Sequence, residues 1–173
     1  PTELLKEYKR LFEERGFSVA GLITPTSLNT PAKKGERAPF CVCWGEEAAR
    51  ERLAAESSRV ASLFNCVIID DFLFSVCNEK CPRCSKEKER ANISDLGEFR
   101  RFQLMDVSKN TILKSGLKAN ASVKFIIKYP CWYRSWEERG YSPRAQAELF
   151  GGAWVGTETR DANPDPLQAC WIV

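Results

Sequence analysis

The apolar positions of the chain follow two different spacings along most of its length. Four segments have the spacing of amphipathic helices: 2–15, 46–64, 94–116 and 142–151. Five short apolar runs predict strands: 17–24, 40–44, 67–72, 123–129 and 153–157. Segments 25–39 and 75–92 fit neither pattern and are predicted to be loops. Repeats of strand, loop and helix favour an α/β fold with a parallel sheet and helices packed outside it.

Two of the predicted strands are apolar without interruption at 67–69 and 125–127, which predicts burial on both faces. A doubly wound sheet and a (β/α)8 barrel both fit this pattern. No glycine-rich phosphate-binding motif follows any strand, which argues against nucleotide binding. The 173 residues suit one domain but are few for a barrel of about 250 residues, and the chain ends on the apolar run 169–173. We therefore expect residues 1–173 to form one truncated domain, a partial (β/α)8 barrel.

Composition excludes several classes of function. The net charge is only +3, and the basic residues alternate with acidic ones, so we expect no nucleic-acid partner. No apolar run approaches the roughly 20 residues of a membrane span, so a soluble protein is expected, in a compartment that the sequence leaves open. The chain contains no histidine, which excludes Ser-His-Asp and Cys-His catalysis within it. Asp, Glu, Lys, Tyr or Cys must therefore carry any acid–base chemistry.

Ionisable and aromatic residues follow three successive predicted strands. Asp70 and Asp71 end one strand, Lys128 and Tyr129 end the next, and the segment 156–161 follows the last. In both candidate architectures, functional groups collect at the carboxyl ends of the strands. The three strand ends, with Trp44 and Trp132 expected on the same rim, therefore predict one site.

Two opposed carboxyl groups are the minimum for glycoside hydrolysis, because one protonates the leaving oxygen and the other attacks or activates water. We expect one from Asp70 or Asp71, which alternation directs to opposite faces, and its partner from Glu158 or Asp161. The predicted substrate contacts are Lys128, Tyr129, Trp132, Arg160 and Trp44. Some of these residues could have a structural role instead of contacting substrate. Arg160 can form a salt bridge with a neighbouring acid, and tryptophan is equally suited to a core.

Three segments carry a resemblance to a known family: Cys66-Val-Ile-Ile-Asp-Asp-Phe-Leu-Phe74, Ile127-Lys-Tyr-Pro-Cys-Trp-Tyr133 and Trp154-Val-Gly-Thr-Glu-Thr-Arg-Asp161. In order and spacing, and in Thr24-Pro-Thr26, the chain resembles an uncharacterised bacterial family of TIM-barrel proteins similar to glycoside hydrolases. The resemblance implies a barrel that begins before Pro1 and continues beyond Val173. It also implies that the Asp70 strand is the fourth of the barrel and the Glu158 strand the sixth, positions that carry the carboxyl groups in some retaining glycosidases.

Three cysteines follow the third predicted strand at the spacing C-x3-C-x2-C: Cys77, Cys81 and Cys84. Radical S-adenosylmethionine enzymes hold a [4Fe–4S] cluster with this spacing, but they place it after the first strand and usually have an aromatic residue where this chain has Arg83. A structural zinc ion is a second possibility, with a fourth ligand from Cys43 or Cys131. The third possibility is that the cysteines form disulfides or remain free thiols and only hold the loop in place.

The sequence thus leaves three classes of function open. The leading hypothesis is a glycoside hydrolase-like enzyme that needs no cofactor and acts on a carbohydrate. The second is a non-catalytic carbohydrate-binding barrel, and the third is an enzyme that depends on a metal ion or a cluster in the cysteine loop. Substrate, stereochemical outcome and oligomeric state are not predicted.

Overall fold

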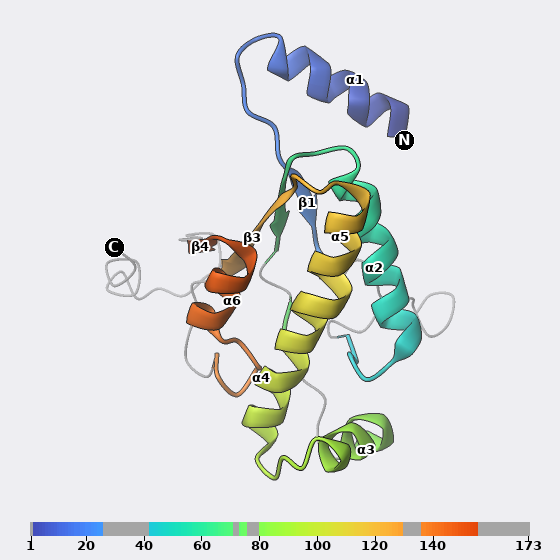
Figure 1. The fold of residues 1–173 in the computed structure, drawn as a ribbon, viewed down its shortest axis with the longest axis vertical. Coiled ribbons are helices and arrows are strands. Elements are labelled where there is room, and N and C mark those ends of the chain that lie inside the picture. The colour runs from blue at the N-terminus through green and yellow to red at the C-terminus, as the bar shows by residue number, and fades with distance from the viewer. Residues whose placement is uncertain (1, 26–41, 71–72, 76–79, 130–135, 156–173) are drawn as a thin grey trace, which may run out of the picture.

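The computed structural model of the chain describes residues 2–25, 42–70, 73–75, 80–129 and 136–155. Its helices are α1 (Thr2–Glu13), α2 (Glu47–Ala61), α3 (Pro82–Arg90), α4 (Leu96–Asp106), the π-helical segment η2 (Val107–Leu113), α5 (Lys114–Ala119) and α6 (Pro143–Phe150). Its strands are β1 (Gly21–Ile23), β2 (Cys66–Ile69), β3 (Lys124–Tyr129) and β4 (Ala153–Val155). Strands and helices alternate along most of this order, which confirms the predicted mixed α/β class (Figure 1).

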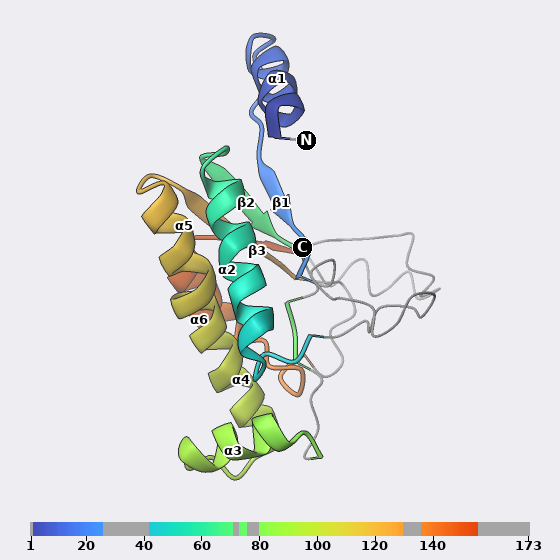
Figure 2. The same cartoon turned by 90° about the vertical axis from the view of Figure 1, so that its right-hand side faces the viewer.

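The four strands form one parallel sheet in the order β1-β2-β3-β4. In this register Ile23 lies beside Ile69, and Ile69 lies beside Ile127. Sequential parallel strands need a crossover between each pair, and helices supply these crossovers. Figure 2 shows α2, the α4–α5 helix and α6 on one side of the sheet. The carboxyl ends of the strands therefore share one edge of the sheet.

The core lies between the sheet and this helical layer. The side chains of β1, β2 and β3 that face the helices are each at most 2% exposed: Ile23, Val67, Ile69, Phe125, Ile127 and Tyr129. They pack in one cluster with helix residues that include Leu53, Val60, Leu104 and Ile112. On the other face Leu22 and Trp154 are about half exposed, and Ile68 and Ile126 are half-buried. Among the described residues, burial is therefore complete only on the helix-facing side of β1, β2 and β3, since all three residues of β4 are exposed.

The helix that precedes β3 is longer than predicted. Gly116 was expected to end it, but α5 continues to Ala119. A Cβ atom at Gly116 would lie 2.3 Å from Cζ of Phe125, so glycine allows the helix to lie directly on the sheet. The residue therefore serves close packing rather than helix termination.

Two predicted segments differ from the structure. Residues 42–44 of the predicted strand 40–44 form no strand, and β1 pairs directly with β2. The numbering of the Asp70 strand as fourth and the Glu158 strand as sixth of a barrel stays a prediction. The predicted loop 75–92 contains α3, which begins with Pro82 at its first turn. Pro82 was read as a loop residue, although proline is also favoured at the first helical position.

Candidate functional site

The carboxyl ends of β1, β2 and β3 bring three polar side chains together. The Thr24 hydroxyl donates to Oδ2 of Asp70 at 3.1 Å, and Lys128 Nζ donates to Oδ1 at 3.2 Å. The side chains of Lys128 and Asp70 are only 12% and 14% exposed. Asp70 is thus a nearly buried carboxylate that accepts hydrogen bonds from both neighbouring strand ends, and we call these three residues the strand-end site.

The sheet register produces this arrangement. The Asp70 amide donates to the carbonyl of Ile23 at 2.9 Å, which extends the pairing of β1 and β2 by one residue. Ile69 and Ile127 are paired and face the helices, so the residues that follow them, Asp70 and Lys128, face the opposite side of the sheet. Opposite charges at this distance attract strongly where water is partly excluded. The prediction that Asp70 and Lys128 would meet is supported by this geometry.

Two of the predicted substrate contacts lie in the core. Trp44 is completely buried, and its indole N–H donates to the carbonyl of Phe74 at 3.1 Å. Tyr129 is 2% exposed, and its hydroxyl donates to Oε1 of Gln146 at 3.1 Å. Both polar groups are used to join segments of the protein. This burial favours a structural role over the predicted contact with substrate.

Six of the predicted site residues lie outside the described residues: Asp71, Cys77, Trp132, Glu158, Arg160 and Asp161. The separation between Asp70 and a second carboxyl group therefore stays a prediction. The described part of the site is one carboxylate with its two donors.

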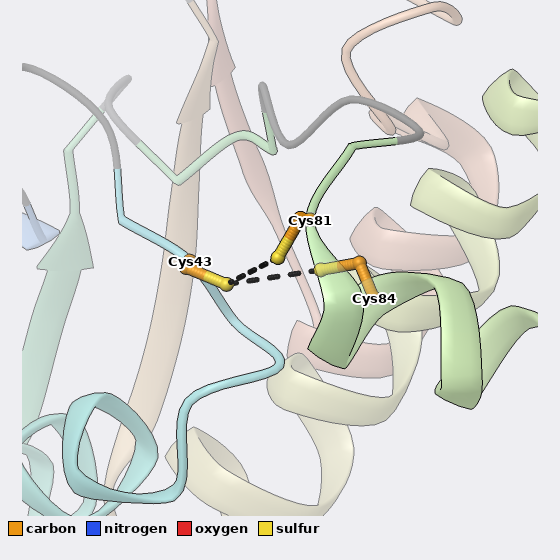
Figure 3. Close-up of side chains that lie close together, drawn as sticks. All are labelled: Cys43, Cys81 and Cys84. Carbon is orange, nitrogen blue, oxygen red and sulfur yellow. Dashed lines mark hydrogen bonds between the residues drawn. The ribbon is translucent and has the colours of Figure 1, made fainter.

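A second cluster forms from the cysteines. Cys43 Sγ lies 3.7 Å from Sγ of both Cys81 and Cys84, and all three sulfur atoms lie within 4.8 Å of one another (Figure 3). Cys43 comes from the segment before α2, whereas Cys81 and Cys84 belong to the first turn of α3. The structure therefore brings together two members of the predicted triplet and one of the two cysteines expected as a further ligand.

Arg50 on α2 ties the helix that carries Cys84 to its neighbours. Its guanidinium group contacts Glu87 of α3 at 3.0 Å and also pairs with Asp106 at the end of α4. Burial tends to raise the pKa of Asp106, but hydrogen bonds from Asn110 and Arg50 outweigh it and hold the pKa below its usual value. The carboxylate form of Asp106 is therefore part of the contact that fixes α3.

Sequence reasoning missed two residues of these sites. Thr24 was named only as part of the family resemblance. Its position at the end of a predicted strand also indicated that it lies at the carboxyl edge of the sheet, with Asp70 and Lys128. Gln103 is fully buried on α4, and its Nε2 donates to Glu87 at 2.7 Å and to Cys84 Sγ at 3.8 Å. A glutamine on the apolar face of a helix, four residues after Phe99, was the available signal. Buried amides of this kind normally have hydrogen-bond partners.

Within the described residues, no helix is both long enough and apolar enough to cross a membrane. The model of a family described as "Probable glycosyl hydrolase, catalytic domain" matches residues 1–170 of the chain. The uncharacterized protein SSO3021 of Saccharolobus solfataricus is 27% identical in an alignment that covers 90% of the chain and 29% of that protein. The chain thus spans less than a third of the length of this relative.

Among solved structures, the chain is similar to a GH20 exo-β-N-acetylglucosaminidase from Vibrio harveyi in complex with N-acetylglucosamine. The TM-score is 0.51 at 13% identity, over 89% of this chain and 37% of that one. At this identity the similarity concerns the fold alone, and it agrees with a parallel sheet covered by helices.

Proposed function

Because the chain belongs to the family of probable glycosyl hydrolase catalytic domains, we propose that it is part of a glycoside hydrolase-like enzyme in which Asp70 acts on a carbohydrate. The observation that carries this proposal is the nearly buried Asp70 carboxylate at the carboxyl ends of three parallel strands. Functional groups occupy this edge in enzymes with parallel α/β architecture. The fold of the described residues and the structural similarity also support the proposal that they form part of a (β/α)8 barrel.

The contacts of Asp70 favour one of the two carboxylate roles. Lys128 and Thr24 both donate to Asp70, so they use its oxygens as acceptors, which suits the ionised form. An ionised carboxylate can attack the anomeric carbon, activate a water molecule or stabilise the positive charge of the transition state. We therefore assign Asp70 to the anionic role. The proton donor is then a second carboxyl group, for which Glu158 and Asp161 remain the candidates.

Activity measurements on the full-length protein test this assignment. The protein is assayed against a panel of aryl α- and β-glycosides, and then Asp70→Asn is compared with wild type on the glycoside that is cleaved. Asp70→Asn keeps the shape of the side chain but removes its charge, so kcat/KM is expected to fall by about 10²- to 10⁴-fold. Glu158→Gln and Asp161→Asn identify the partner by a similar loss.

Glu148→Gln is the matched control, because Glu148 is an exposed carboxylate that pairs only locally with Arg144 on α6. It is expected to keep wild-type activity. Full activity in Asp70→Asn would overturn the assignment. Sugar binding that depends on Asp70, without hydrolysis of any glycoside in the panel, would instead favour the non-catalytic carbohydrate-binding barrel.

A further inference from the structure

We propose that Cys43, Cys81 and Cys84 bind a single zinc ion that fixes the rim of the sheet beside the strand-end site. These three cysteines are the group of potential ligands whose sulfur atoms converge among the described residues. The proposal concerns a structural metal ion, so it does not depend on the carbohydrate chemistry assigned to Asp70.

The distances fit one tetrahedral ion. Thiolates bind zinc at about 2.3 Å, so two thiolates on a tetrahedral ion lie about 3.8 Å apart. The Cys43 sulfur lies 3.7 Å from the other two sulfurs. In a [4Fe–4S] cluster each thiolate binds a different iron atom, so the sulfurs are spread more widely than around a single ion. A covalent S–S bond is about 2.05 Å long, so these contacts are also not disulfides. The geometry therefore favours one ion over a cluster.

The local backbone is shaped for this contact. Cys81 and Cys84 have the C-x2-C spacing of zinc sites, and Cys81 is the N-cap residue of α3. The segment that carries Cys43 approaches closely at Gly45, where a Cβ atom would lie 3.1 Å from Cys84 Sγ. A larger residue at this position would push the two segments apart.

Polar groups surround the cluster where a simple apolar core would have none. Gln103 is fully buried, and its amide donates to Cys84 Sγ at 3.8 Å. The Gln103 carbonyl accepts from the Ser75 hydroxyl at 3.3 Å, which fixes the orientation of the amide. Donors of this kind orient metal ligands and stabilise the charge on a thiolate. Buried thiols that only fill space need no such donor.

The ion would join two segments that follow adjacent strand ends. Cys43 follows β1 in the chain, and Cys81 and Cys84 follow β2, the strand that leads directly into Asp70. Trp44, next to Cys43, already bonds to Phe74 between β2 and α3. A shared zinc ion would hold both segments at the edge where Asp70 lies. Three thiolates leave one tetrahedral position for a further ligand.

Metal analysis of the full-length protein, purified without air or chelator, tests the proposal directly. Zinc is expected at one ion per chain, without iron or acid-labile sulfide. Replacement of the zinc with Co²⁺ is expected to give the absorption bands of tetrahedral cobalt and a sulfur-to-cobalt charge-transfer band. Reduced thiols without metal, disulfide bonds among these cysteines, or iron with sulfide would each overturn the proposal. These measurements need no variant and no enzyme activity.

Substitutions then assign the ligands. Cys43→Ser and Cys84→Ser are expected to lose the stoichiometric zinc, as measured by competition with a chromophoric chelator. Cys66→Ser is the matched control, because Cys66 is a half-buried cysteine on β2 that does not belong to the cluster. It is expected to keep zinc. Zinc retained in Cys84→Ser, or lost equally in Cys66→Ser, would contradict the site.

Discussion

The strand-end site and the cysteine cluster are both built from segments that follow the ends of β1 and β2 in the chain, but the fold builds them differently. Asp70, Lys128 and Thr24 meet because they directly follow or belong to paired strands. Cys43 meets Cys81 and Cys84 only because two connecting segments fold against each other. The positions of the first group are fixed by backbone hydrogen bonds of the sheet. Those of the second group rest on side-chain contacts, and we propose a bound ion among them.

This difference predicts that metal removal destabilises the protein strongly and that loss of Asp70 does not. Loss of a bound structural metal is among the few changes that cost more than about 4–5 kcal/mol. We expect the chelator-treated protein to lose about that much free energy of unfolding in urea, and added zinc to restore it. Asp70→Asn, measured in the same way with zinc bound, is expected to change the value by less than about 3 kcal/mol. Equal free energies of unfolding with and without chelator would contradict the predicted difference between metal removal and loss of Asp70.

A second test breaks the strand-end site alone. Lys128→Met removes the charged donor from the nearly buried Asp70 carboxylate, so it is expected to cost about 1.5–3 kcal/mol in the free energy of unfolding. The double variant Lys128→Met/Asp70→Asn should recover part of this loss, because it also removes the negative charge that Lys128 pairs with. Bound zinc should be unchanged in both variants. Additive losses in the double-mutant cycle would show that the two side chains do not interact.

A third test weakens the helix contacts around the cysteine cluster. Arg50→Met removes the pairing of α2 with Glu87 and Asp106, and we expect a loss of about 1–2 kcal/mol together with weaker zinc binding. Arg144→Met, which removes an exposed pair on α6, is the control and should change neither quantity measurably. Zinc affinity that is identical in Arg50→Met and wild type would show that α3 is held without this contact.

The pH dependence of stability gives a smaller effect. The pKa of Asp106 is held below its ordinary value of 3.8, so its ionised form stabilises the folded state above that pH. The contribution is lost as the pH falls through the lower, folded pKa. We expect Asp106→Asn to be less stable than wild type by about 1 kcal/mol or less at pH 7, with the deficit disappearing as the pH falls below 3.8. A deficit that persists at lower pH would mean that charge is not the cause.

The smallest effect is expected from an exposed pair outside both sites. Arg59 donates to Glu56 within α2, which lowers the pKa of Glu56. Glu56→Gln should cost less than about 0.5 kcal/mol, since exposed helix pairs contribute little. Urea unfolding at pH 7 checks this value. A loss of unfolding free energy as large as that of Lys128→Met would show that solvent exposure does not predict how much an ion pair contributes to stability.

The difference between sheet-built and loop-built sites also explains which features could be predicted from the sequence. The apolar runs at β2 and β3 located those strands, and period-two alternation then decided that Asp70 faces away from the helices, once Ile69 was known to face them. The order of strands in a sequential parallel sheet placed Lys128 beside Asp70. These features follow from local pattern and sheet geometry.

The rest depended on contacts between distant segments. The apolar run at Phe40–Trp44 was predicted as a strand, but residues 42–44 form no strand. Val42 and Trp44 are instead buried in the core, which accounts for the apolar character of this segment. The cysteine spacing identified Cys81 and Cys84, yet only the folding of the chain placed Cys43 beside them. Spacing gives no information about which distant residue completes a cluster.

A crystal structure of the full-length protein with the sugar product of the glycoside that it cleaves would test the central claim most directly. We predict that the sugar binds at the carboxyl ends of β1, β2 and β3, with a carboxylate oxygen of Asp70 within hydrogen-bonding distance of it or facing its anomeric carbon. A sugar bound at the opposite edge of the sheet, or at this edge without contact to Asp70, would contradict the claim.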